Sequence, residues 1–396
     1  MNWYMNSYDH SKPFTPIGYT NFRNSNKLFG IKLADRFSHI YAIGKTGVGK
    51  TTLLLNMAID DIHKGYGVAL IEPHGDACMK LLQNIPEHRK GDVVYFDATN
   101  LSQPTGFNPL LNVPIAERHL VASELVLAFK KIWGDSWGPR MEYIWRFCIL
   151  TLLEYPTATL LDIQPLLLDY AFRNLVLQYT DNMAILSFWH NEFEKYPATL
   201  KAESIMPILN KAGGFSANVI LKEIVGQQES INIEEIMNSE KILICNLSKG
   251  IIGEDVSQIL GSLLTSGIQM AAMRRAKLPE QERKPFMTYI DECHSFITTS
   301  FAAMLSEIRK YKIGLYLTHQ YLEQLPEEVR GAILGNVGTI LTFRLGTADA
   351  KVMAEEFYPV FTTDDFINLP IFHIYLKLLI KGTASRPFSA TTIARL

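Results

Sequence analysis

The sequence predicts an α/β protein whose parallel sheet is interrupted by a long helical segment. Residues 39–76 alternate a short apolar run, a glycine-rich loop, an amphipathic segment and a second apolar run, which is the pattern of a strand, helix and strand unit with a parallel sheet. Across residues 110–240, apolar residues recur at spacings of three and four, which is typical of helices. Strand-like runs then return at residues 241–248, 286–292, 313–319 and 338–346.

These patterns predict a division of the chain into three parts. Residues 1–27 are rich in Asn, Ser, Tyr and Pro and show no periodicity, so we expect an N-terminal arm. Residues 28–110 and 240–396 are expected to form one discontinuous α/β domain, and residues 111–239 an all-α domain inserted into it. Further elements of the α/β domain are expected at residues 92–99 (a strand), 254–277 and 301–310 (helices).

The composition limits the possible functions. The 38 Lys and Arg residues balance 40 Asp and Glu residues for a net charge of −2, which excludes a polybasic protein that wraps nucleic acid by bulk charge. Four cysteines without a CxxC spacing predict buried free thiols in a reducing compartment, not a zinc site. Neither a secretory signal nor an apolar run of membrane-spanning length is visible, so we expect a cytoplasmic protein without a membrane span of its own.

A phosphate-binding loop is the strongest signal in the chain. Gly44, Lys45, Thr46, Gly47, Val48, Gly49, Lys50 and Thr51 match the pattern G-x-x-x-x-G-K-[ST] between an apolar strand and a helix. Glycines let backbone N–H groups curl around phosphate oxygens, and the helix N-terminus directs its dipole at the same anion. Lys50 would reach the β and γ phosphates, Thr51 would bind Mg²⁺, and Thr52 would touch the α-phosphate. The sequence therefore predicts ATP and Mg²⁺ as cofactors.

Two adjacent acids follow a second apolar strand. Residues 287–290 form the apolar run, and Asp291 and Glu292 follow it directly. A nucleotide hydrolase needs carboxylates at this position. Asp291 would hold the magnesium ion through its water shell, and Glu292 would act as the general base for the attacking water. The alternative is that the two acids cap the start of a following helix. Capping does not require a buried apolar strand before the acids, so we favour the catalytic interpretation.

Three further polar residues are candidates for the same site. Gln320 follows the strand at residues 313–319 and could bind the attacking water or the γ-phosphate; the alternative is a glutamine in an exposed turn. Arg344 ends the expected strand at residues 339–343, and Arg140 follows Gly-Pro at a helix start. Either could act as an arginine finger on the γ-phosphate of a neighbouring subunit, and either could form a surface ion pair.

Eight runs of the sequence carry a family resemblance. In chain order they are DRFSHIYAIGKTGVGKTTLL, VALIEPHGD, VVYFDATN, GFNPL, NLSKGIIGED, YIDECHSF, LTHQYLEQL and FRLGTADA. Together they resemble the HerA/FtsK superfamily of ring-forming motors, and most closely the ATPase domain of type IV secretion coupling proteins, the TraG/TraD-like conjugative DNA-transfer ATPases. The resemblance covers residues 28–390. It implies a RecA-like P-loop core, a hexameric ring, ATP hydrolysis at subunit interfaces and DNA in the central channel.

The resemblance also implies roles for individual residues. Lys50 and Thr51 match the Walker A pair, Asp291 and Glu292 match the Walker B pair, and Gln320 matches the glutamine at the tip of the next strand. Residues 110–240 are similar to the all-α domain of coupling proteins, and Arg344 lies in a run that matches the family pattern. Glu72 is a conservative change from the strand-end acid that is usual in the family at this position. The implied partners are DNA, further copies of the chain, and a relaxase or secretion-channel protein. Coupling proteins usually carry N-terminal transmembrane helices, which this chain lacks, so docking on a secretion channel and recruitment to the inner membrane face stay open. HerA helicases usually carry an N-terminal β-barrel, for which the segment before residue 28 is too short.

Several alternatives stay open from the sequence. Basic residues around a loop could supply pore cations for DNA, although cations at a helix C-terminus also complement its dipole, which we favour; these residues are Arg274, Arg275, Lys277, Arg283 and Lys284. The leading hypothesis is an ATP-driven DNA translocase. A viral or mobile-element packaging ATPase and a nucleotide-gated scaffold that recruits proteins are alternatives. A small-molecule kinase is disfavoured, because it has no use for a base such as Glu292.

Overall fold

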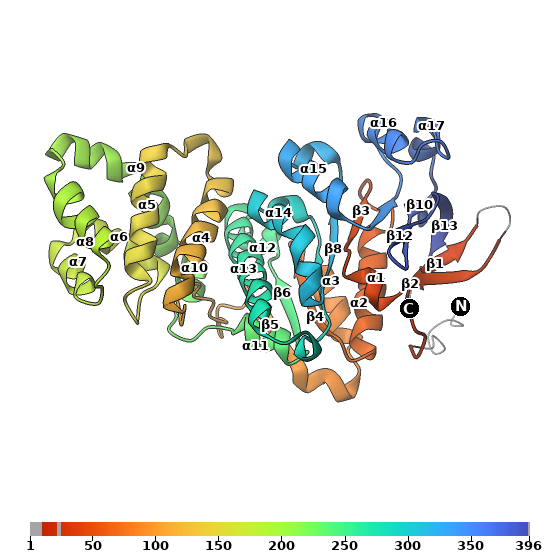
Figure 1. The fold of residues 1–396 in the computed structure, drawn as a ribbon, viewed down its shortest axis with the longest axis horizontal. Coiled ribbons are helices and arrows are strands. Elements are labelled where there is room, and N and C mark those ends of the chain that lie inside the picture. Colours follow the sequence, from red (N-terminus) through yellow and green to blue (C-terminus); the bar gives the residue numbers. More distant parts are fainter. Residues whose placement is uncertain (1–9, 22–24, 395–396) are drawn as a thin grey trace. The chain divides into compact units, whose positions relative to one another are not determined.

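The computed structural model describes residues 10–21 and 25–394. The chain divides into two compact units (Figure 1). The first unit comprises Met1–Phe96, Ile233–Ser248 and Ala271–Leu396, and the second comprises Asp97–Asn232 and Lys249–Met270.

A sheet of eleven strands forms the centre of the first unit, in the order β2-β1-β13-β10-β9-β3-β8-β7-β4-β6-β5. In chain order these strands are β1 (Thr15–Thr20), β2 (Leu28–Ile31), β3 (Ile40–Ile43), β4 (Gly67–Glu72), β5 (Val93–Asp97), β6 (Ile242–Asn246), β7 (Phe286–Ile290), β8 (Ile313–His319), β9 (Thr339–Thr342), β10 (His373–Lys377) and β13 (Phe388–Thr392). A separate hairpin joins β11 (Leu379–Ile380) and β12 (Thr383–Ala384). The six adjacent strands from β9 to β6 are parallel, and their apolar side chains are buried, as expected for a sheet covered on both faces.

The register of the parallel strands brings three chain segments to one edge of the sheet. Ile43 at the end of β3 lies opposite His319 at the end of β8. Ile290 at the end of β7 lies opposite Leu317 of β8 and Ile71 of β4. Because parallel strands end at the same edge, the loops after β3, β7 and β8 meet there. This edge is where an open α/β sheet binds its ligands.

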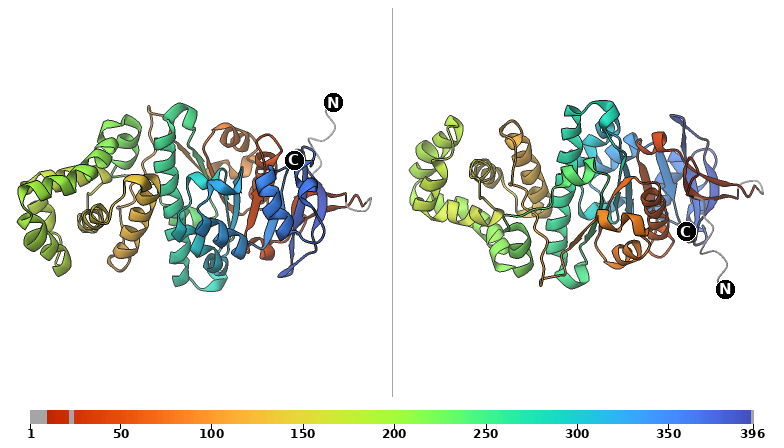
Figure 2. Two further views of the ribbon diagram at one scale, coloured as in Figure 1. Left: turned by 90° about the horizontal axis from the view of Figure 1, so that it is seen from above. Right: turned by 90° about the horizontal axis from the view of Figure 1, so that it is seen from below.

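Helices pack on both faces of the sheet in the first unit (Figure 2). They are α1 (Leu33–Arg36), α2 (Lys50–His63), α3 (Asp76–Gln83), α11 (Ile233–Asn238), α14 (Thr299–Ile308), α15 (Glu327–Asn336), α16 (Thr347–Glu356) and α17 (Thr363–Ile367). The connection through α2 leads from β3 to β4, whereas α14 returns in the opposite direction from β7 to β8. Right-handed crossovers therefore place α2 and α14 on opposite faces.

A buried ion pair fixes α2 against the sheet. Asp61 of α2 is fully buried and accepts hydrogen bonds from both terminal nitrogens of Arg36, at 3.1 and 2.9 Å. Tyr289 of β7 donates to the same carboxylate at 2.5 Å and accepts from Arg36 at 2.9 Å. The carboxylate also accepts from Thr15 at 3.0 Å. With these partners the buried charge is compensated, and the helix that begins at Lys50 is held beside the strand that leads to Asp291.

The N-terminal part of the chain differs from the expectation. Residues 1–9 and 22–24 of the expected arm lie outside the described residues, but Thr15–Thr20 form β1 within the sheet. β1 pairs antiparallel with β13, a strand near the other end of the chain, and with β2 (Figure 1). A register shift between Pro16 and Gly18 interrupts the alternation that would mark a strand in the sequence. The expected parallel core therefore has an antiparallel extension, made of β2, β1, β13 and β10.

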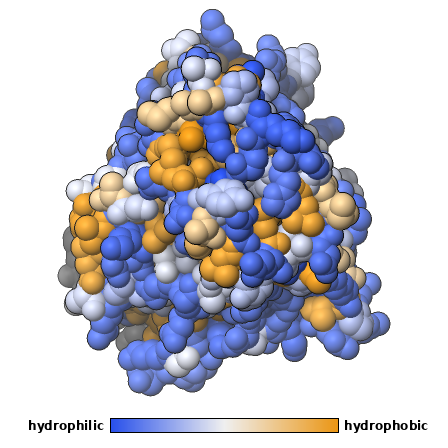
Figure 3. All heavy atoms as spheres, turned by 90° about the vertical axis from the view of Figure 1, so that its left-hand side faces the viewer, coloured by the Kyte–Doolittle hydropathy of each residue, from blue (hydrophilic) through white to orange (hydrophobic). Residues whose placement is uncertain are grey.

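The second unit is helical. Its helices are α4 (Arg118–Ile132), α5 (Pro139–Leu152), α6 (Ile163–Leu168), α7 (Tyr170–Leu177), α8 (Met183–Ser187), α9 (Ala198–Ala217), α10 (Val219–Val225) and α12 (Lys249–Ile252), and α13 (Glu254–Arg274) begins in it. Trp133, Trp145 and Phe215 pack around Phe129 in its core. Apolar side chains are also exposed in separate patches on the face seen in Figure 3, and exposed residues of this unit include Leu168, Tyr170, Leu175, Tyr179 and Met183.

The unit boundaries are not those expected for the insertion. Residues 97–110 and 249–270 group with the helical unit, and α11 at residues 233–238 groups with the sheet. An independently folding insertion at residues 111–239 stays a prediction. All four cysteines are buried and none forms a disulfide. Within residues 10–21 and 25–394, no helix combines the length and the apolar character needed to span a bilayer.

Candidate functional site

The glycine-rich loop connects β3 to α2 at the edge where the parallel strands end. Gly47 and Gly49 have φ angles of 75° and 113°, which favour glycine because residues with a Cβ rarely adopt them. At Gly44 a Cβ would lie 2.5 Å from the Cβ of Phe343, at the end of the neighbouring strand β9. Gly49 is the residue before the first turn of α2. The loop therefore has the backbone conformation that its sequence predicts, with the helix N-terminus beside it.

Lys50 lies folded into this loop. Its side chain is buried, and Nζ donates hydrogen bonds to the carbonyl oxygens of Gly44 at 2.5 Å and Lys45 at 2.9 Å. Burial lowers the pKa of Lys50, while the negative charges of Glu292 and Asp291 oppose that shift. The two acids that the sequence places 241 and 242 positions away thus act electrostatically on the loop lysine.

Asp291 is held by hydroxyl groups from two other elements. Its Oδ2 accepts a hydrogen bond from the Thr51 hydroxyl at 2.9 Å, and Oδ1 accepts from the Thr318 hydroxyl of β8 at 2.6 Å. Oδ1 also accepts from the backbone N–H of Glu292 at 3.0 Å. A hydroxyl and a carboxylate in contact are the hard oxygen ligands that Mg²⁺ prefers, so Thr51 and Asp291 fit a magnesium site.

Glu292 occupies a constrained position directly after Asp291. Its backbone is in the left-handed region, with φ of 48°, and its side chain is buried. Oε1 accepts a hydrogen bond from Nε2 of Gln320 at 2.9 Å. Burial raises the pKa of Glu292, and the charge of Asp291 adds to that shift. The short 3₁₀ turn Cys293–Ser295 follows, and no side chain of Glu292 caps it. The helix-capping alternative is thus not what the structure shows for Glu292.

Gln320 connects the base candidate to the phosphate loop. Its Nε2 donates to Glu292, and its Oε1 accepts from the hydroxyl of Thr46 at 3.0 Å. The residue before it, His319, is buried, lies 3.3 Å from the hydroxyl of Tyr41 and has a pKa lowered by burial to about 3. The tip of β8 therefore places Gln320 in the site, whereas His319 packs beneath it as a neutral structural residue.

The two arginine candidates lie in different units. Arg344 follows β9 in the first unit, and its backbone oxygen accepts a hydrogen bond from the N–H of Lys45 at 2.9 Å. Its guanidinium is half-buried and has neither a hydrogen bond nor an ion pair among the described residues. Arg140 is exposed at the start of α5 in the helical unit. The backbone of Arg344 is thus in contact with the phosphate loop of its own chain.

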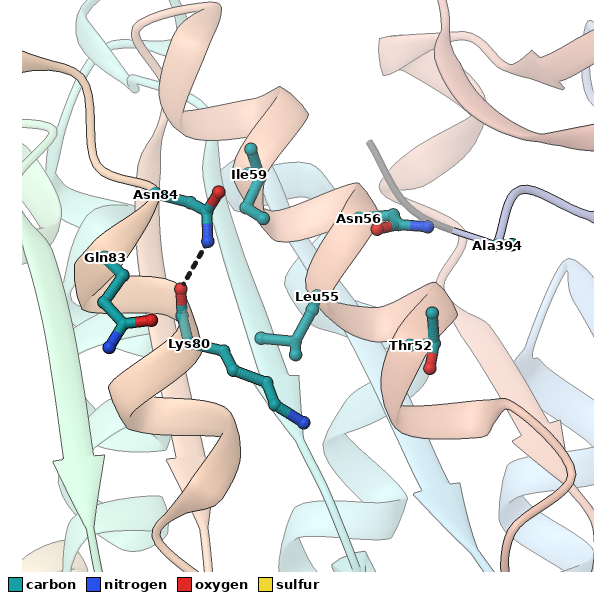
Figure 4. Close-up of a pocket in the computed structure, with 8 residues that line it drawn as sticks. All are labelled: Thr52, Leu55, Asn56, Ile59, Lys80, Gln83, Asn84 and Ala394. Atoms are coloured by element: carbon teal, nitrogen blue, oxygen red, sulfur yellow. Dashed lines mark hydrogen bonds between the residues drawn. The ribbon is translucent and has the colours of Figure 1, made fainter. Parts of the chain in front are cut away.

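A cavity of about 340 Å³ lies beside α2 and begins at Thr52, the residue after the phosphate loop (Figure 4). Thr52, Leu55, Asn56 and Ile59 of α2 line one side, Lys80, Gln83 and Asn84 at the end of α3 line another, and Ala394 completes it. Thr52, expected at the α-phosphate, is therefore shared between the loop and a cavity with amide and ammonium groups in its wall.

Three of the basic residues considered as possible pore cations have structural partners. Arg275 is buried and donates to Asn238 and to the backbone oxygens of Lys284, Tyr311 and Met237. Arg283 donates to the backbone oxygens of Arg275, Leu278 and Lys310, and Arg274 pairs with Glu234 at 3.1 Å. The structure accounts for these three arginines without DNA.

The structure adds contacts around the site that the sequence did not indicate. Thr318 holds Asp291, and its place two residues before Gln320 at a strand end was a usable signal. Glu72 accepts from the backbone N–H groups of His74 at 2.7 Å and Gly75 at 2.5 Å, and burial raises its pKa. His294 lies 3.4 Å from Oε2 of Glu292 and 3.2 Å from Gln324, contacts that no sequence pattern marks.

Nearly the whole chain superimposes on solved structures of other proteins. The bacterial conjugative coupling protein TrwB, lacking its first 70 residues, matches with a TM-score of 0.69 over 96% of this chain and 89% of its own, at 13% identity. The fold is that of a conjugative coupling protein. TrwB in complex with ADP and Mg²⁺ matches with a TM-score of 0.69 over 97% and 96% of the two chains, also at 13% identity. VirB4 of Thermoanaerobacter pseudethanolicus matches with a TM-score of 0.63 over 96% of both chains, at 15% identity.

The fold expectation is confirmed by these likenesses. The RecA-like P-loop core with its parallel sheet is the fold of TrwB and VirB4. No protein-family model and no curated protein matches the sequence. At 12–15% identity the likeness to TrwB and VirB4 extends to the fold, and the residue roles rest on the geometry of this chain.

Proposed function

We propose that this protein is a Mg²⁺-dependent ATPase whose hydrolysis drives DNA translocation, in the manner of type IV secretion coupling motors. The observation that carries the proposal is the convergence of four side chains: Thr51 contacts Asp291 at 2.9 Å, and Glu292 contacts Gln320 at 2.9 Å. The fold of TrwB and VirB4 supports the assignment to this class of motor.

In the proposed reaction each side chain of the site has a role in ATP hydrolysis. Loop N–H groups from Gly44 to Thr51 and the ammonium of Lys50 would bind the phosphates, and Thr51 and Asp291 would hold Mg²⁺. Magnesium would neutralise charge on the β and γ phosphates. Glu292 would accept a proton from the attacking water as the water oxygen bonds to the γ-phosphorus, and ADP would leave. Gln320 would orient that water or the γ-phosphate.

The proposal also assigns a position to the nucleoside. Thr52 lines both the end of the phosphate loop and the cavity between α2 and α3. We propose that the ribose and adenine occupy this cavity, where Asn56, Gln83 and Asn84 offer amide donors and acceptors. The Lys80 side chain also lines the cavity (Figure 4).

Assembly would complete the site. We propose a homo-hexameric ring in which an arginine of the neighbouring subunit reaches the γ-phosphate. Arg344 and Arg140 are both candidates; the guanidinium of Arg344 has no partner among the described residues, and Arg140 is exposed. In this proposal the motor works in the cytoplasm, is recruited to the inner membrane face, and has a relaxase or secretion-channel protein as a further partner.

The test is the steady-state ATPase rate against protein concentration, with and without single-stranded and double-stranded DNA. We expect the rate per subunit to rise steeply with concentration and again with DNA. Arg344→Ala and Arg140→Ala are assayed in the same experiment. The arginine finger is the residue whose substitution abolishes hydrolysis but leaves nucleotide binding intact. A rate that is flat in concentration and indifferent to DNA would contradict the translocase and favour the protein-recruiting scaffold.

A further inference from the structure

The orientation of one side-chain amide beyond β8 is fixed by its neighbours. Gln324 ends the 3₁₀ turn Leu322–Gln324, and its Oε1 accepts hydrogen bonds from the backbone N–H groups of Gln320 at 3.1 Å and Tyr321 at 3.2 Å. Backbone N–H groups only donate, so the atom that they contact must be the amide oxygen. The amide nitrogen of Gln324 is therefore the atom that lies 3.2 Å from Nε2 of His294.

This contact determines the tautomer of His294. An amide nitrogen only donates, so Nε2 of His294 must be the acceptor, and the hydroxyl of Ser295, 3.3 Å from the same Nε2, can donate to it as well. A neutral imidazole carries one proton, which then resides on Nδ1. Nδ1 lies 3.4 Å from Oε2 of Glu292.

Nδ1 of His294 thus lies 3.4 Å from the carboxylate oxygen that Gln320 does not hold. Oε1 of Glu292 accepts from Gln320 at 2.9 Å, whereas Oε2 is buried and has no hydrogen bond among the described residues. One oxygen of this carboxylate accepts a hydrogen bond and the other lies near an N–H group. These two contacts favour one orientation of the carboxylate plane.

We propose that His294 and Gln324 are positioning residues for the base: Gln324 holds His294 as the Nδ1–H tautomer, and His294 fixes the rotation of the Glu292 carboxylate through Oε2. This inference rests on the proposed function, in which Glu292 is the general base. Gln324 also accepts from the backbone of Gln320, so one amide orients both the base and the tip of β8. The base is thereby oriented before the reaction begins.

The tautomer can be read directly from the ring ¹⁵N resonances of histidine-labelled protein without nucleotide, assigned by their loss in His294→Asn. We expect Nδ1 to be protonated and Nε2 unprotonated in the wild type. Gln324→Glu replaces the donor with a carboxylate oxygen and should move the proton to Nε2, whereas Gln103→Glu, at an exposed loop position, should change nothing. A protonated Nε2 in the wild type, or an unprotonated Nε2 in Gln324→Glu, would overturn the proposal.

Kinetics provide a second readout that a merely structural role would not produce. His294→Ala should lower kcat about tenfold with KM within about twofold, because the lost interaction orients the base and does not bind nucleotide. His294→Asn, whose amide nitrogen can occupy the place of Nδ1, should restore kcat to within about threefold of wild type. Equal losses in both variants would overturn the positioning role. If the wild type hydrolyses no ATP, the proposed function fails, and the ¹⁵N measurement still decides the tautomer.

Discussion

The side-chain amide of Gln320 is hydrogen-bonded to the carboxylate of Glu292, at 2.9 Å. The other end of the same amide accepts from the hydroxyl of Thr46 in the phosphate loop, at 3.0 Å. The tips of β7 and β8 and the loop after β3 are thus joined through one glutamine. A displacement of any of these segments would change the contact of the base, which makes Gln320 the natural sensor of nucleotide state in the proposed mechanism.

Loss of the loop lysine should strongly weaken nucleotide binding. Lys50→Ala removes the ammonium group that would contact the β and γ phosphates, so we expect affinity for a fluorescent ATP analogue to fall about a hundredfold. Lys45→Ala changes an exposed lysine of the same loop and should alter affinity by less than about threefold. Equal effects of the two changes would contradict the assigned role of Lys50.

Glu292→Gln should separate binding from hydrolysis. The amide cannot accept the proton of the attacking water, so we expect turnover to fall by about 10²–10⁴-fold with ATP affinity nearly unchanged. Glu307→Gln, an exposed glutamate of α14, is the matched control and should retain wild-type turnover. Turnover that is unchanged in Glu292→Gln would remove this residue from the mechanism.

Thr46 and Gln320 should be energetically coupled. Gln320→Ala removes the contact to Glu292 and is expected to lower kcat about thirtyfold. Thr46→Val removes only the hydroxyl group that donates to Gln320 and should lower kcat about threefold. Because both changes break the same contact, the double variant should be no slower than Gln320→Ala alone. Fully multiplicative losses in single-turnover kinetics would show that the two residues act independently.

His39 should make folding stability depend on pH. This buried residue precedes β3; its Nε2 lies 2.8 Å from the backbone oxygen of Leu305, and its Nδ1 accepts from the N–H of Leu315 at 3.2 Å. Burial lowers the pKa of His39 to about 4 from 6.5. In the unfolded chain His39 is therefore protonated below about pH 6.5, whereas in the folded chain it is protonated only below about pH 4.

Because the unfolded chain binds this proton more readily, the free energy of unfolding should decrease as the pH falls. Stability from neutral His39 is fully present above pH 6.5 and is lost as the pH falls toward 4, by about 3 kcal/mol in total. Urea unfolding at pH 7 and pH 5 should show this slope in the wild type and a flatter one in His39→Gln. His190→Gln, at an exposed position, should keep the wild-type slope. An identical slope in His39→Gln would rule out this residue as the cause.

The sequence by itself determined the parts of the protein whose signals are local. A strand directly precedes the glycine-rich loop, and the strand at residues 313–319 has the expected bounds, because apolar runs and a glycine loop suffice to specify them. The expected helix at residues 254–277 is α13 with a 3₁₀ turn at its end. Parallel strands end at one edge of their sheet, so the carboxylates of Asp291 and Glu292 could be placed beside the phosphate loop from pattern alone.

Only the tertiary structure decided the contacts between segments that are far apart in the sequence. β1 pairs with β13, which lies near the other end of the sequence, and the pattern of residues 15–20 does not indicate that pairing. Gln324 reaches His294 from the end of the next strand, and Thr318 reaches Asp291. Such contacts depend on strand register and side-chain rotamers, which are set by packing throughout the unit. For that reason the sequence identified the acids, whereas the tertiary structure determined which groups hold them.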